Sequence, residues 1–145
     1  MPKKQDTRVW DEITKKIKKI QRGEHVKVGV FGDATKAASH EFGTKTIPKR
    51  SFIRFTFEKQ EQALAEMTKK VFSKFMDGSL SADQALGLLG EWGAKEVKNT
   101  IHKEGYGTWP PLSPGYAMIK PTLGSSKMLV LTGEMINSIT YKVGK

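Results

Sequence analysis

Histidines and carboxylates are the residues whose type and spacing would first indicate catalysis or metal binding. The three histidines, His25, His40 and His102, are too far apart for two of them to bind a metal from adjacent turns of one helix. Asp33 and Glu41 are too few for a magnesium-dependent nuclease, which needs several carboxylates converging with a lysine. Cysteine is absent, which excludes disulfides, thiolate metal sites and cysteine nucleophiles. We therefore expect no enzyme activity, no metal site and no cofactor.

Two glycine-containing segments lie near candidate phosphate contacts. They are GVFGD at 29–33 and GSSK at 124–127. Neither has the Gly-x4-Gly-Lys-Ser/Thr spacing that wraps backbone N–H groups around a phosphate. Ordinary turns explain both segments, so neither predicts a nucleotide site.

A basic and aromatic run, KRSFIRFTF at 49–57, is a better candidate for a nucleic-acid contact. If the run is helical, Arg50 and Arg54 share one face and could bind phosphates. The alternative is that Phe52, Ile53 and Phe57 belong to the core and the arginines form salt bridges. The cations that we predict to face DNA, in this run and elsewhere, are Lys15, Lys18, Lys19, Lys45, Lys49 and Arg54.

The overall charge is strongly positive. The chain has 25 Lys and Arg against 15 Asp and Glu, which gives a net charge of +10 over 145 residues. Such an excess favours polyanions or an acidic protein partner. No apolar run approaches the roughly 18 residues needed to span a bilayer, and no apolar segment follows the charged N-terminus. We expect neither a membrane span nor a secretory signal.

The spacing of apolar residues predicts three main helices, at 6–22, at 51–76 and from 81 to about 103. Alternating, β-branched segments at 25–31 and 138–143 predict two strands that pair with each other. These elements indicate an α+β fold, with the three helices packed on a small antiparallel sheet.

Two long extended loops connect these elements. They cover 34–50, which includes a short helical turn at 37–41, and 105–127, which holds several prolines and large apolar side chains. Loops of this length in a compact domain are usually functional or ordered by a partner. We treat 1–145 as a single domain and both loops as assembly arms.

The first helix is amphipathic. The two faces differ sharply, with Val9, Trp10, Ile13, Ile17 and Ile20 on one side and Lys15, Lys16, Lys18 and Lys19 on the other. The lysine face is either solvated or a docking surface for nucleic acid or an acidic protein.

The third helix has two local features. Ser81 and Gln84 match a capping box at its start. Gly87, Gly90 and Gly93 recur inside it, at a cost of about 1 kcal/mol each relative to alanine. We interpret these glycines as sites of close helix–helix packing or of a bend.

Two segments together resemble a known family. The first reads His-Glu-Phe-Gly at 40–43 and Ile-Pro-Lys-Arg-Ser-Phe at 47–52. The second reads Trp-Pro-Pro-Leu-Ser at 109–113, then Lys120, then Leu-x-x-Thr-Gly-x-Met-x-x-Ser-Ile at 129–139. These motifs resemble the neck and tail-completion proteins (head–tail connectors) of tailed bacteriophages, including the Mu-type virion morphogenesis group. In the Mu-type group the second segment precedes the first, so the exact ring and role stay open.

The resemblance implies a structural protein without enzyme activity or cofactor, assembled as a ring of six or twelve copies between phage head and tail. The ring would join the portal or connector to a tail-tube or sheath protein, line the passage of the packaged DNA, and belong to the virion, assembled in the host cytoplasm. A basic nucleic-acid-binding module is the alternative. The predicted subunit-interface residues are Phe42, Ile47, Pro48, Arg50, Phe52, Trp109, Leu112 and Tyr116.

Overall fold

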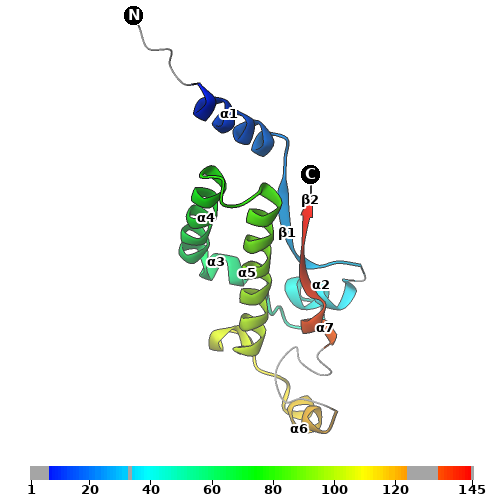
Figure 1. Ribbon diagram of the computed structural model, residues 1–145. Helices are drawn as coiled ribbons and strands as arrows, with labels where there is room; N and C mark the ends of the chain where they lie inside the picture. Colours follow the sequence, from blue (N-terminus) through cyan, green and yellow to red (C-terminus); the bar gives the residue numbers. More distant parts are fainter. Residues whose placement is uncertain (1–6, 33, 124–133, 145) are drawn as a thin grey trace, which may run out of the picture.

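The computed structural model describes residues 7–32, 34–123 and 134–144. Within these residues the chain forms seven α-helices, one short 3-10 turn and a two-stranded antiparallel sheet, which confirms the predicted α+β class (Figure 1). In chain order the elements are α1 (Arg8–Gln21), β1 (His25–Val30), α2 (Thr35–Phe42), α3 (Arg54–Lys59), α4 (Glu61–Met76), α5 (Ala82–His102), η1 (Glu104–Gly107), α6 (Pro114–Leu123), α7 (Glu134–Asn137) and β2 (Ile139–Gly144).

The predicted pairing of the two strands is confirmed. Strands β1 and β2 run antiparallel, with Val28 opposite Tyr141 and Val30 opposite Ile139. Alternate residues point to one face of a strand, so these side chains share the face that is turned to the core. Ile139 is fully buried there.

Helix α5 covers this face of the sheet and contacts both strands (Figure 1). A Cβ atom added at Gly90 would lie 2.5 Å from the Tyr141 ring, and one added at Gly93 would lie 3.0 Å from Val28. The glycines therefore allow the helix to approach the sheet. Our interpretation of them as helix–helix contacts or a bend was wrong at Gly90, whereas at Gly93 a Cβ atom would also lie 3.4 Å from Phe57 of α3 (Arg54–Lys59), a helix–helix contact. The capping box of Ser81 with Gln84 is present as predicted.

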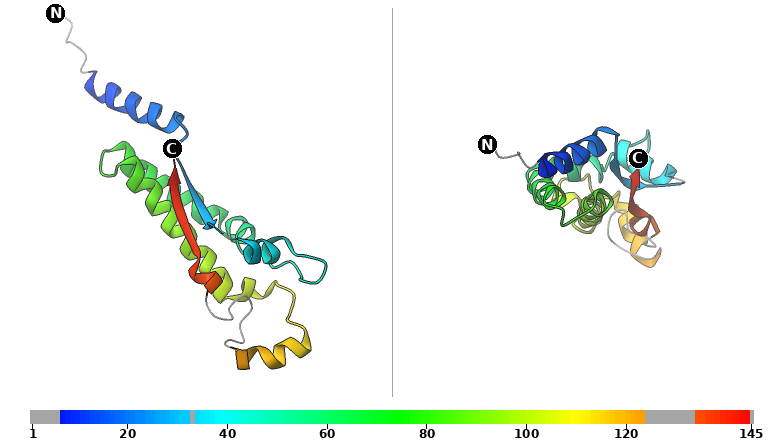
Figure 2. Two further views of the ribbon diagram at one scale, coloured as in Figure 1. Left: turned by 90° about the vertical axis from the view of Figure 1, so that its right-hand side faces the viewer. Right: turned by 45° about the horizontal axis from the view of Figure 1, so that its top comes forward.

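The helix predicted at 51–76 is two helices. Helix α3 ends at Lys59, Gln60 leaves helical geometry with φ −99° and ψ 18°, and α4 begins at Glu61. Helix α4 then packs alongside α5, away from the sheet (Figure 2). Its buried residues Val71 and Phe75 form a second apolar cluster with the start of α5.

Helix α1 extends past the ends of α4 and α5 instead of lying on the sheet (Figures 1 and 2). One contact of α1 with the body is made by Lys16, whose Nζ donates to the Met76 carbonyl at 2.8 Å and lies 5.6 Å from the centre of the Phe75 ring. Of the three main helices that we expected on the sheet, only α5 occupies that position.

The two predicted loops contain regular structure. Helix α2 fills the first half of 34–50, and η1 and α6 fill much of 105–127. Residue 33 and the segments 124–127 and 129–133, to which part of the sequence argument applied, lie outside the described residues. Among the described helices, none is long and apolar enough to cross a membrane.

Candidate functional site

Glu41, at the end of α2, binds the start of α3 with both carboxylate oxygens. Oε2 accepts hydrogen bonds from the backbone N–H of Phe52 at 2.8 Å and of Ile53 at 2.9 Å. Oε1 accepts from the Arg54 N–H at 2.9 Å and from the Ser51 hydroxyl at 2.7 Å. The first N–H groups of a helix have no partner within the helix. Glu41 therefore caps α3 from a different element.

The environment keeps the Glu41 side chain ionised. Burial alone would raise the pKa of this carboxyl group. Hydrogen bonds from the backbone of Ile53 and Arg54, from the Ser51 hydroxyl and from Phe52 outweigh burial, so the net pKa is lowered. A negative charge at a helix N-terminus is also favoured by the helix dipole.

Arg50 is buried and clamps a second segment of the chain onto the first. Its Nε donates to the Pro110 carbonyl and its Nη2 to the Pro111 carbonyl, both at 2.9 Å. Burial lowers the pKa of this guanidinium group. Because α3 begins only at Arg54, the two arginines do not share a helical face. The proposed phosphate-binding pair of Arg50 and Arg54 was therefore wrong.

Trp109 is the second clamp between the two segments. Its Nε1 donates to the Ser51 carbonyl at 3.1 Å, and only 8% of the residue is exposed. A Cβ atom at Gly105 would lie 2.5 Å from the indole, so only glycine leaves room for the ring. We call residues 40–54 together with 104–111 the joint.

The turn that brings Trp109 into place is left-handed. Glu104, Gly105, Tyr106 and Gly107 have φ values of 51°, 68°, 53° and 79°. Left-handed geometry costs a non-glycine residue roughly 1–2 kcal/mol, so Glu104 and Tyr106 are strained. The Tyr106 ring lies 4.5 Å from the Lys59 ammonium group, a contact that offsets part of this cost.

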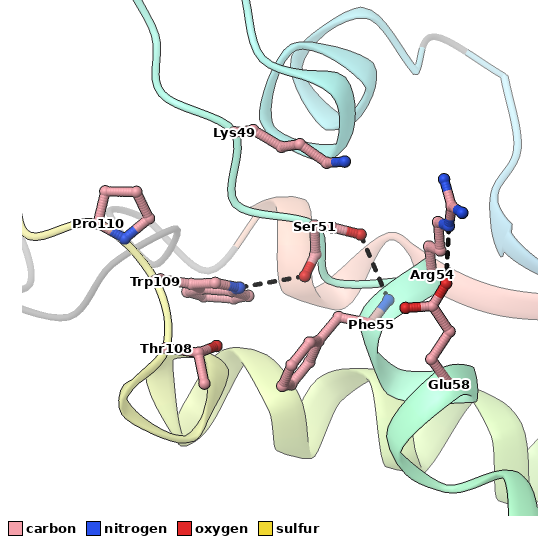
Figure 3. Close-up of a pocket in the computed structure, with 8 residues that line it drawn as sticks. All are labelled: Lys49, Ser51, Arg54, Phe55, Glu58, Thr108, Trp109 and Pro110. Atoms are coloured by element: carbon pink, nitrogen blue, oxygen red, sulfur yellow. Dashed lines mark hydrogen bonds and ion pairs between the residues drawn. The ribbon is translucent and has the colours of Figure 1, made fainter.

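A shallow groove of about 390 Å³ opens on the surface of the joint (Figure 3). It brings together three residues that the sequence singled out, Lys49, Arg54 and Trp109. Its full lining is Lys49, Ser51, Arg54, Phe55, Glu58, Thr108, Trp109 and Pro110. Arg54 is paired with Glu58 at 2.8 Å, and both side chains are largely exposed. The groove therefore offers a neutralised ion pair and Lys49, rather than a strong anion site.

The polar groups of the joint mostly bind other groups of the joint. The Ser51 hydroxyl donates to Glu41 and accepts from the Phe55 N–H at 3.3 Å, so it acts as a cap. His40 has a buried Nδ1 without a partner in the described part of the chain, and burial together with the Arg50 charge lowers its pKa. No three side chains that could hold a metal gather among the described residues.

The remaining predicted interface residues divide by exposure. Phe42, Pro48 and Tyr116 are exposed, and Ile47 and Leu112 are partly buried. Phe52 has no exposed surface at all, so its place is in the core of its own chain. With Arg50 and Trp109 it supports the joint instead of offering a surface to a neighbour. Five cations that we predicted to face DNA, Lys15, Lys18, Lys45, Lys49 and Arg54, are exposed, and the Lys19 side chain lies outside the described residues.

Two helices carry exposed apolar side chains. One is α1, which we expected to pack on the sheet, and the other is α6, within the segment 105–127 that we predicted to be an assembly arm. The stripe of α1 is largely exposed, with 69% exposure at Trp10. On α6, Met118 is 82% exposed and Ile119 is also exposed, while Lys120 is only 3% exposed. Helix α6 thus turns apolar side chains outward and its lysine inward. Burial lowers the pKa of Lys120, and the charge of Glu104 opposes that shift.

Comparisons of this chain with protein-family models, with curated proteins and with solved structures find no match.

Proposed function

We propose that the chain is a structural protein of a tailed-phage particle that forms a ring at the junction of head and tail. The observation that carries the proposal is the pair of exposed apolar surfaces on α1 and α6. Apolar patches of this kind on a small protein mark sites of protein–protein contact. The motif resemblance described above gives the location in the virion and the portal or connector and tail proteins as partners.

The placement of the two surfaces supports a ring. Helices α1 and α6 lie at opposite ends of the elongated molecule, in both side views (Figures 1 and 2). Their sequences differ, so a contact between copies at these ends joins one patch to a different patch. Such heterologous contacts close into rings when the rotation between subunits permits it, and otherwise extend into filaments.

The joint supports the same proposal. Arg50 ties the two loops that we predicted to be assembly arms to each other, and Trp109 binds the adjoining Ser51. Glu41 fixes the end of the first loop to the start of α3. A joint held by buried hydrogen bonds fixes the position of the surfaces on either side of it. Fixed surfaces reduce the ordering cost of assembly.

The test is the mass of the purified protein by light scattering and native mass spectrometry, alone and with a portal or tail-tube protein. We expect a closed oligomer of six or twelve copies, in one or both conditions. A chain that remains monomeric in both conditions, and never enters particles, contradicts the proposal.

DNA affinity separates the ring from the alternative of a nucleic-acid-binding module. The exposed lysines, which include Lys15, Lys18 and Lys45, are the observation that keeps this alternative in view. A dedicated binder stays tight at physiological salt, and its affinity falls steeply as salt rises. We expect weak binding of free DNA under those conditions. Tight binding by a monomer would favour the alternative.

A further inference from the structure

We propose that the apolar stripe of α1 in one copy packs against the outward face of α6 in the next copy. The proposal rests on the ring proposed above and names the two surfaces that form its contact. It commits to a second copy of this chain as the partner of both helices.

The inverted arrangement of α6 is the first argument. A helix at the surface of an isolated protein normally turns its charged residues to water and its apolar residues inward. In α6, Met118 and Ile119 face water while Lys120 is buried. Covering the outward face by an apolar partner gives these side chains a favourable environment at roughly 25 cal/mol for each Å² of apolar surface removed from water.

Charge is the second argument. Copies of a chain with a net charge of +10 repel one another, so a self-contact is most favourable where charges are absent. Residues 105–119 form the longest stretch of the sequence without a charged side chain, and they include the exposed part of α6. Lys15 and Lys18 of α1, by contrast, are exposed on the side away from its apolar stripe, and Lys16 donates to the body of its own chain. An α1–α6 contact therefore brings together the least charged surfaces of both helices.

Dimensions are the third argument. Helix α1 has 14 residues and α6 has 10, which correspond to about 21 Å and 15 Å at the helical rise of about 1.5 Å per residue. Trp10 supplies a large aromatic anchor, the residue type most often found at the energetic centre of an interface. Most of the stripe is exposed, at Val9, Trp10, Ile17 and Ile20, so another molecule can reach these side chains without displacing a neighbouring element.

The sharpest test is complementation between two damaged chains. One variant carries Trp10→Ser and Ile17→Ser, and the other carries Met118→Ser and Ile119→Ser. All four residues are exposed, so both variants should fold. Each variant alone should lose self-association, with the apparent Kd raised by about 30-fold or more, the effect of losing one energetic anchor.

An equimolar mixture of the two variants should form 1:1 dimers. The intact α1 of one chain meets the intact α6 of the other, and growth stops because the damaged surfaces lie at the two ends. A mixture that stays monomeric overturns the proposal, as does either variant that assembles like the wild type. A matched control, Lys15→Ser with Lys18→Ser on the opposite face of α1, should leave association unchanged.

The absence of cysteine from the chain allows a direct check of the contact. We expect a disulfide between chains in at least one pairing when Trp10→Cys or Ile17→Cys variants are mixed with Met118→Cys or Ile119→Cys variants and oxidised, because a disulfide requires Cα atoms within about 7 Å. Absence of a mixed dimer in every pairing contradicts the contact. If the wild type forms rings and the variants do so equally well, only the α1–α6 contact fails. If the wild type never oligomerises, the proposed function fails with it.

Discussion

The two tryptophans at Trp10 and Trp109 show how differently the two ends of this molecule use the same residue type. Trp109 is 8% exposed in the joint, whereas Trp10 is 69% exposed on α1. They differ in their surroundings, because the Trp109 indole donates to the Ser51 carbonyl and packs on Gly105, where no Cβ atom is in the way. The joint is therefore packed within one chain, whereas most of the apolar stripe of α1 stays exposed.

The cations of the two regions differ in the same way. Arg50 is buried in the joint and is bound by two carbonyl groups, Pro110 and Pro111. Lys15 on α1 keeps a largely exposed side chain, in a loose pair with Glu12 at 3.7 Å. Exposed pairs of this kind contribute little to stability, typically about 0–1 kcal/mol. Arg50, which the sequence suggested as a phosphate ligand, is thus a residue that stabilises the fold.

The largest difference in the free energy of unfolding should appear when each tryptophan is replaced by alanine. Trp109→Ala removes a buried indole and its hydrogen bond, and should lower the free energy of unfolding by about 3–5 kcal/mol. The matched variant Trp10→Ala should change it by less than about 0.5 kcal/mol, because exposed positions contribute little. Urea titration followed by circular dichroism measures both. Equal losses would show that α1 is as firmly packed as the joint.

A smaller effect should follow from Glu41→Gln. The amide keeps one acceptor oxygen, but its NH₂ group faces backbone donors that the carboxylate now binds. We expect a loss of about 2–3 kcal/mol, because buried donors are left unsatisfied. Glu58→Gln is the control, since Glu58 is exposed and pairs only with Arg54 among the contacts described for it. A silent Glu41→Gln variant would mean that the joint does not depend on this cap.

The pH dependence of stability should identify the same carboxylate. The pKa of Glu41 in the folded chain is lowered from its ordinary value of 4.5, so the folded state holds the proton less tightly than the unfolded chain. Its contribution is complete above pH 4.5 and is lost as the pH falls through the lowered value. Urea titrations between pH 7 and pH 3 should show wild type and Glu41→Gln converging at the acid end. A constant difference would contradict this assignment.

His40 should add a separate slope at higher pH. Its pKa is lowered from 6.5, so the unfolded chain takes up a proton first and stability declines as the pH falls from that value. This slope should persist in Glu41→Gln and disappear in His40→Gln. The two variants therefore separate the contributions of adjacent residues.

Local sequence patterns predicted the helices and strands, whereas contacts between residues far apart in the sequence determine how these elements pack. The strands at 25–31 and 138–143 and the cap at Ser81 follow from neighbouring residues, and each is present. Glu41 was outside the reach of such rules, because it caps a helix that begins 13 residues later and belongs to another element. The sequence shows only a glutamate upstream of a predicted helix, without the short spacing of a local cap.

Our expectation for the apolar stripe of α1 failed for a different reason, because the helix itself was predicted correctly. Apolar spacing correctly predicted a helix at 6–22, and we assumed that its stripe would be buried in the same chain. The length of α6 was also missed, because prolines at 110, 111, 114 and 121 indicated a loop. Pro114 occupies the first position of the helix, where proline is well tolerated. Periodicity thus reports the existence of a buried face and leaves open which molecule buries it.

The smallest predicted effect concerns the attachment of α1 and compares two lysines of the same helix. Lys16 donates to the Met76 carbonyl and lies over the Phe75 ring, whereas Lys18 is exposed. Lys16→Ala should cost about 1 kcal/mol, the sum of one hydrogen bond and a weak cation–π contact, and should increase amide exchange in α1.

Lys18→Ala should leave stability within about 0.5 kcal/mol and leave self-association unchanged, because Lys18 lies opposite the apolar stripe. The two substitutions remove the same charge, so any difference between them reports position alone. If Lys18 contacted phosphate, its loss would reduce the salt slope of DNA binding by about 1, with assembly intact. An unchanged slope with Lys18→Ala, together with loosened α1 in Lys16→Ala, is what a helix held for assembly requires. A reduced salt slope in Lys18→Ala, together with unchanged amide exchange in Lys16→Ala, would indicate that α1 binds DNA. The joint alone would then be the region that stabilises the fold.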